Sequence, residues 1–172
     1  LGKMPMMPES SPTYCPVPRE QQPVMEYEAL KEAWLFRWGT LEQGFYLRNL
    51  MIVFGLGWLL TSPIAAASFA PMKRPILFVL ASTLGAIGVL GLLLLRILLG
   101  WYYVSDRLQD EQVIYEESGW YDGQRWQKPP EVLARDRLIV SYEIKPILKR
   151  LQQTSLILLG LMGIDGLIWL SL

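Results

Sequence analysis

The sequence predicts a mainly α-helical membrane protein with three transmembrane helices and a small cytoplasmic or stromal α+β part. Two observations predict this fold class. Three apolar stretches, 47–70, 76–104 and 155–172, have lengths close to the ~20 residues that a helix needs to cross hydrocarbon. Almost all of the 16 basic and 16 acidic residues lie outside these stretches. Soluble proteins rarely bury apolar runs of this length, so a bilayer is the expected solvent around them.

Composition limits the chemistry. The chain has 172 residues, no histidine, one cysteine and no net charge. The missing histidine excludes a histidine base and histidine-ligated zinc, haem or chlorophyll, and one cysteine cannot form an intrachain disulfide. A balanced charge gives no support for a nucleic-acid partner.

The N-terminal part divides into two segments. Residues 1–24 are proline-rich and predicted to be extended, without the apolar core of a signal peptide. Residues 25–46 are predicted to form an amphipathic interfacial helix. Two interpretations remain open: this helix lies in the membrane interface, or it packs against the long segment that follows the second span. Its apolar stripe is Tyr27, Leu30, Trp34, Trp38 and Leu41.

Residues 47–104 are predicted to form a transmembrane helical hairpin. Only residues 71–75 separate its two helices, so they must be antiparallel neighbours. Trp101, Tyr102 and Tyr103 are expected to mark the interface at the far end of the second helix.

Residues 105–154 are predicted to form a β-hairpin followed by a helix. Asp122-Gly123 is a strong signal for a two-residue type I′ turn. That register pairs Trp120 with Arg125 and Gly119 with Trp126. Pro146 should break or kink the following helix and turn the chain into the third span, 155–172.

Asp165 lies near the middle of the third span, where an acidic residue is costly. It is expected to bond between helices or subunits, with a proton relay as the less favoured role. Arg96 lies in the second span too far from Asp165 in depth to be its natural partner, so a lipid phosphate or a partner's carboxylate is expected to meet it. Gly160 and Gly163 permit close helix packing, within this bundle or against another protein.

The charge distribution predicts an orientation. Thirteen Lys and Arg residues lie in 1–48 and 105–150, against two in 71–75. The positive-inside rule then puts the N-terminus and residues 105–154 on the cytoplasmic or stromal side, and the C-terminus on the other, lumenal side.

Five short stretches stand out together: CPVP at 15–18, EQQP at 20–23, EY at 26–27, GWYDGQRW at 119–126 and RDRLIVSYEIKPILKRL at 135–151. With these stretches the chain resembles the conserved hypothetical chloroplast reading frame family of the green lineage, algae and cyanobacteria. The resemblance implies a thylakoid membrane protein without an established activity.

The leading hypothesis is a non-catalytic thylakoid protein that binds a photosynthetic complex, a photosystem, as an accessory subunit or assembly factor. No motif of a known enzyme class occurs. Alternatives are a pigment- or lipid-handling protein with chlorophyll or carotenoid contact, and a small transporter or membrane enzyme that uses Asp165. The expected partners are membrane lipids and photosystem subunits. The predicted docking residues are Trp120, Tyr121, Asp122, Gly123, Arg125 and Trp126, with Arg96, Asp165, Gly160 and Gly163 in the membrane.

Overall fold

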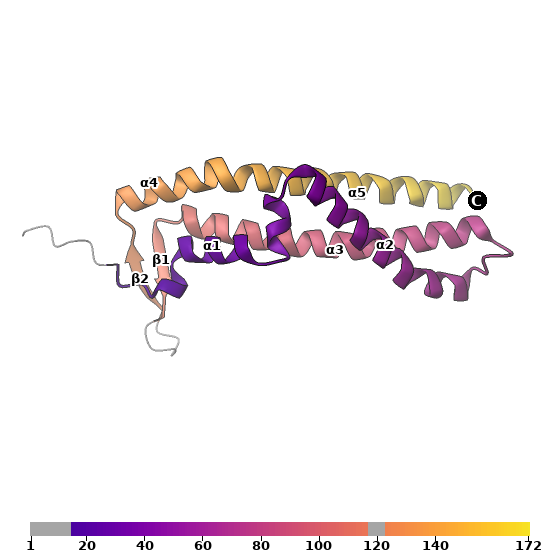
Figure 1. Ribbon diagram of the computed structural model, residues 1–172, viewed down its shortest axis with the longest axis horizontal. Helices are drawn as coiled ribbons and strands as arrows, with labels where there is room; N and C mark the ends of the chain where they lie inside the picture. Colours follow the sequence, from indigo (N-terminus) through magenta and orange to yellow (C-terminus); the bar gives the residue numbers. More distant parts are fainter. Residues whose placement is uncertain (1–14, 117–122) are drawn as a thin grey trace, which may run out of the picture.

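The computed structural model describes residues 15–116 and 123–172 as an elongated helical molecule with a two-stranded hairpin at one end (Figure 1). Three helical rods in this part of the chain are long and apolar enough to cross a membrane, which confirms the predicted long helices. The elements in chain order are the 3₁₀ turn η1 (Arg19–Gln21), α1 (Pro23–Glu32), the 3₁₀ turn η2 (Phe36–Thr40), α2 (Gln43–Ser68), α3 (Pro75–Gln109), β1 (Gln112–Tyr115), β2 (Gln124–Gln127), α4 (Pro130–Ile139), the π-helical turn η3 (Val140–Ile144) and α5 (Lys145–Ser171).

Helices α2 and α3 form the predicted antiparallel hairpin, and small residues set their spacing. A Cβ at Gly85 would lie 2.7 Å from Thr61 Cγ2, and one at Gly57 would lie 3.3 Å from the Cα of Ala86. The Thr61 hydroxyl donates across the pair to the carbonyl of Ser82, at 2.9 Å. Glycine therefore brings the two backbones close enough for an interhelical hydrogen bond.

Helix α3 continues five residues past the predicted end of its span. Its 35 residues make a rod of about 52 Å, well beyond the ~30 Å of hydrocarbon. Trp101 lies near the end of the predicted span and is fully buried, with its Nε1 donating to the carbonyl of Phe36 at 3.1 Å. The prediction that Trp101 marks the membrane interface is wrong because its ring packs inside the protein, edge-on to Tyr27 at 6.2 Å between centroids.

The single helix predicted over 25–46 is wrong in extent. Helix α1 ends at Glu32, Ala33 is extended, and the chain turns through η2 before α2 begins at Gln43. This turn lets the ring of Phe36 cover the bare backbone of Gly100 on α3. Helix α1 itself packs along the extended end of α3 (Figure 1).

The elbow predicted at Pro146 is also wrong, because α4, η3 and α5 form one rod from Pro130 to Ser171. Proline cannot donate the backbone hydrogen bond that an α-helix needs at its position. The π turn just before it changes the hydrogen-bond register: the N–H of Lys145 donates to the carbonyl of Val140, five residues back. A π-bulge therefore carries the helix past the proline.

The hairpin exists but its predicted register is wrong. Trp126 pairs with Val113 and Arg125 with Ile114, so neither strand residue takes the partner that a two-residue turn would give it. The connection runs from residue 116 to 123. The residues of β2 thus pair with the aromatic and β-branched residues of β1. A two-residue turn at Asp122-Gly123 would instead have paired them with Gly119 and Trp120.

The two ends of the molecule differ in character. The hairpin, α1 and α4 lie at one end, whereas the α2–α3 connection and the C-terminus lie at the other (Figure 1). The fully buried core residues lie toward the first end and include Leu94, Ile97, Leu108, Ile144 and Leu151. We call residues 15–42, 105–116 and 123–150 the polar end.

Candidate interaction surfaces and the polar end

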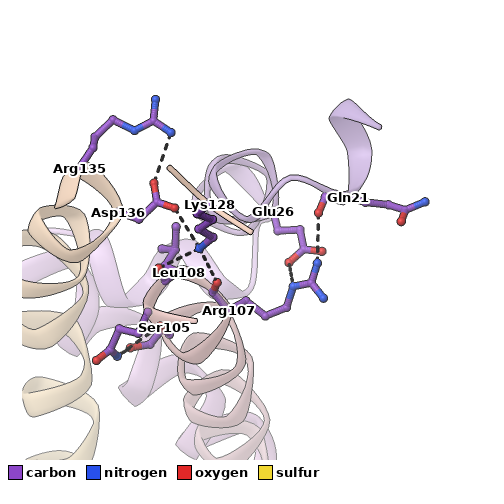
Figure 2. Close-up of polar contacts among 9 residues, drawn as sticks. Gln21, Glu26, Ser105, Arg107, Leu108, Lys128, Arg135 and Asp136 are labelled. Carbon is purple, nitrogen blue, oxygen red and sulfur yellow. Dashed lines mark hydrogen bonds and ion pairs between the residues drawn. The ribbon is translucent and has the colours of Figure 1, made fainter. Parts of the chain in front are cut away.

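A buried lysine ties the hairpin to two helices at the polar end (Figure 2). Lys128 Nζ lies 3.1 Å from Asp136 Oδ2 of α4, and both side chains are 1% exposed. The same ammonium donates to the carbonyls of Arg107 and Leu108, at 3.0 Å each. These carbonyls belong to the last turn of α3, where the helix has no further N–H groups to satisfy them. Lys128 thus caps α3 and neutralises Asp136, a role the sequence analysis missed.

A second ion pair fastens the N-terminal segment to α3. Arg107 Nε lies 3.0 Å from Glu26 Oε2, and its Nη2 donates to the carbonyl of Gln21 at 3.1 Å (Figure 2). Burial raises the pKa of the Glu26 carboxyl, and Arg107 opposes that rise. The Gln21 amide in turn makes two hydrogen bonds with the backbone of Glu116, at 2.9 and 3.0 Å. Segment 15–26 is thereby joined to both α3 and β1.

Helix α1 is also fastened to the π turn. The Tyr27 hydroxyl donates to Glu143, and Lys31 Nζ lies 3.1 Å from the same carboxylate oxygen. Hydrogen bonds from Tyr27 and Lys31 lower the pKa of Glu143. The widened turn of η3 thus places Glu143 against α1. It connects these two elements in addition to carrying the helix past Pro146.

The hairpin residues predicted to dock a partner divide into three groups. Trp120, Tyr121 and Asp122 lie outside the described residues. Gly123 and Arg125 are exposed. Trp126 is half-buried and packs with Val17, Val113 and Tyr115 in a small cluster. The hairpin therefore uses Trp126 to hold the N-terminal segment.

The glycines of α5 do not pack within the bundle. A Cβ added at Gly160 or Gly163 would meet no atom of the described chain within 4 Å, in contrast to Gly57 and Gly85. The interpretation that these α5 glycines serve packing inside the three-helix bundle is therefore wrong. Both glycines are exposed on the outside of the helix, where another helix or lipid can reach them.

An apolar groove of about 440 Å³ runs between α3 and α5. Gly88 and Gly91 line it from α3, and Leu158 and Met162 line it from α5. Asp165 lies three residues beyond Met162, so it falls on the same α3-facing side of the helix. It is 6% exposed, and its Oδ1 has no hydrogen-bond partner among the described residues.

Arg96 stands at the other face of the α2–α3 pair. Its guanidinium lies 5.0 Å from the centroid of the Phe36 ring. Within 15–116 and 123–172 it makes no ion pair, and Asp165 is not its partner. The same part of the chain holds no group of three acidic or cysteine side chains placed to bind a metal.

Comparison with known proteins decides the family. The model of the family described as CGLD27-like, "Conserved in the green lineage and diatoms 27", matches residues 15–157. The chain is a member of the CGLD27-like family. The match begins with the segment that joins the hairpin to α3 and runs through α2 and α3 into α5. It therefore includes the whole described polar end, and it confirms the resemblance carried by the short motifs.

The relatives of this CGLD27-like protein include a chloroplast protein and several ycf36 proteins. A protein of Arabidopsis thaliana named "Conserved in the green lineage and diatoms 27, chloroplastic" is 51% identical over 143 residues, which are 80% of this chain and 42% of the relative. The ycf36 protein of Pyropia yezoensis is 46% identical over 83% of this chain and 86% of its own length. The ycf36 protein of Cyanophora paradoxa is 42% identical over 91% and 98%.

The chain spans less than half of the Arabidopsis relative but nearly all of the Cyanophora one. No solved structure matches this CGLD27-like chain.

Proposed function

We propose that this CGLD27-like protein is a non-catalytic thylakoid membrane protein that binds a photosynthetic complex, a photosystem, as an accessory subunit or assembly factor. The polar end faces the stroma and the C-terminus faces the lumen. The concentration of Lys and Arg residues at the polar end, against only Lys73 and Arg74 in the α2–α3 connection, supports this orientation. The chloroplast location in the name of the Arabidopsis relative supports the compartment.

The observation that carries the proposal is the bare outer face of α5. Beyond Leu151, Asp165 is the one described residue of this helix that is buried. The neighbouring α2–α3 pair shows how this chain uses glycine when two of its own helices meet. Gly160 and Gly163 offer the same close approach with nothing of the described chain in place. The groove beside them, with Gly88 and Gly91 on α3, widens the surface that a partner helix would cover.

The test replaces both outward glycines and follows the complex. Wild-type protein and the Gly160→Val/Gly163→Val variant are expressed in a host thylakoid, solubilised in two mild detergents and separated on native gels. We expect the wild type to migrate with a photosystem-sized complex and the variant to shift to a small free species. Two added β-branched side chains prevent the close approach of a partner helix.

Gly55→Val is the matched control because Gly55 also lies in a long apolar helix with no described atom within 4 Å of an added Cβ. This variant should stay with the complex. Wild-type protein that migrates only as a small free species in both detergents, or a double variant that migrates as the wild type does, contradicts the proposal.

A further inference from the structure

We propose that the outer face of the α2–α3 pair is a binding site for a single anionic membrane lipid. Its headgroup lies on Arg96, and one acyl chain lies in the groove below, lined by Leu56, Val89 and Leu92. This inference rests on the membrane insertion proposed above, and none of the residues that line this groove belongs to α5.

The depth of Arg96 supports the headgroup position. Twenty-one residues separate it from Pro75, the first residue of α3. At 1.5 Å per residue this is about 32 Å, close to the ~30 Å thickness of the hydrocarbon core. If the α2–α3 connection lies at one membrane surface, Arg96 lies at the opposite one. Arg96 is thus level with lipid headgroups.

The groove has the position and character of an acyl-chain site. It measures about 660 Å³, and its wall is almost entirely apolar. It runs from Arg96 down to the level of Val89, seven residues or about 10 Å into the hydrocarbon. Trp34 and Trp38 of the N-terminal segment form its upper rim. Trp34 is 77% exposed, and an amphipathic indole at this depth is typical of contact with the headgroup region.

Charge complementarity selects an anionic occupant. The guanidinium of Arg96 has the Phe36 ring below it and, among the described residues, no carboxylate or carbonyl as an acceptor. A guanidinium offers five donors and binds planar or tetrahedral oxyanions well. The molecule that joins an oxyanion to a long apolar chain, in this geometry, is an anionic lipid.

The same helix pair offers a matched control. Arg48 of α2 is also exposed, also stands 5.0 Å from a phenylalanine ring centroid, and also makes no ion pair among the described residues. Gly57 of α2 and Ala86 of α3 lie against each other, so they have the same depth. Arg48 is nine residues from Gly57, and Arg96 is ten residues from Ala86. The two arginines therefore lie at nearly equal depth. Arg48 does not line the groove.

The experiment measures retained lipid by native mass spectrometry. The full chain is purified in detergent, incubated with phosphatidylglycerol or with phosphatidylcholine of the same acyl chains, and the one-lipid adduct is quantified. We expect the wild type to retain phosphatidylglycerol over phosphatidylcholine. Arg96→Gln should lower the phosphatidylglycerol adduct about fivefold or more, the effect of one basic residue on an anionic headgroup. Arg48→Gln should leave it within about twofold.

A second variant tests the groove without touching the charge. Leu56 is 60% exposed on the groove wall, so Leu56→Trp fills the groove without disturbing the core. We expect it to lower the phosphatidylglycerol adduct as Arg96→Gln does. Equal retention of phosphatidylcholine, equal effects of Arg48→Gln and Arg96→Gln, or an unchanged adduct in Leu56→Trp would each overturn the inference. Alkaline carbonate extraction of the host membranes tests insertion separately, and none of these lipid results decides it.

Discussion

At the scale of single residues, the polar end depends on buried and half-buried charges that each have defined partners. Lys128 contacts Asp136 and the last carbonyls of α3, and Arg107 contacts Glu26 and Gln21. These contacts join segments up to 86 residues apart. A buried ion pair contributes little net stability when it is complete, but the loss of one partner leaves the other charge in a dry site.

Substitution of Lys128 should therefore be much more costly than substitution of an exposed cation. We expect Lys128→Met to destabilise the polar end by about 3–5 kcal/mol, since Asp136 remains buried and unpaired. Arg137→Gln is the control: Arg137 lies 3.7 Å from Glu111 with both side chains more than half exposed, and its loss should cost about 0–1 kcal/mol. Denaturant titration of the purified proteins, followed by circular dichroism, compares them. Similar midpoints for the two variants would contradict the role given to Lys128.

At the scale of helices, glycines that share one sequence pattern have opposite roles. Gly85 faces Thr61 of α2, whereas Gly88, three residues on, faces open space beside the groove to α5. The two positions have the same helix propensity, and both have apolar residues on either side in the sequence. Only contact with a second helix distinguishes them.

This contrast makes a matched prediction within one helix. We expect Gly85→Val to destabilise the α2–α3 pair by about 1–3 kcal/mol, because its Cβ would lie 2.7 Å from Thr61 Cγ2 and the helices would have to separate. Gly88→Val should leave stability nearly unchanged, since its Cβ meets no described atom within 4 Å. Unfolding in mixed micelles with a denaturing detergent measures both. A Gly88→Val protein as unstable as Gly85→Val would show that the groove closes in the membrane.

At the scale of the whole molecule, the fold separates two ends. The charged segments before α2 and after α3 come together through the contacts of Lys128, Arg107 and Tyr27. The α2–α3 connection and the C-terminus lie together at the opposite end (Figure 1). A bilayer between the two ends would leave both charged segments in water on one side.

Site-directed labelling tests this arrangement directly. In a Cys15→Ser background, single cysteines are placed at Met72, Ser171 and Arg125, all exposed. With a membrane-impermeant thiol reagent on sealed thylakoid vesicles of known orientation, we expect Met72→Cys and Ser171→Cys to react from one side and Arg125→Cys from the other. Reaction of Met72→Cys and Arg125→Cys from the same side would contradict the three-span arrangement.

The sequence by itself determined the number of long helices, the short link between the first two and the gathering of charge, because each depends on local apolar length and composition. It also predicted that strands flank Asp122-Gly123, though with the wrong register. The tertiary structure decided the rest. Whether Trp101 faces a membrane interface or a protein core, whether Gly160 packs inside or outside, and which carboxylate Lys128 meets all depend on contacts between segments distant in sequence. Pro146 does not break the helix because the π turn before it shifts the backbone hydrogen-bond register. Glu143 of that turn accepts a hydrogen bond from Tyr27 of α1. The local sequence pattern determines which residues are removed from water, but only tertiary packing determines which residues they contact.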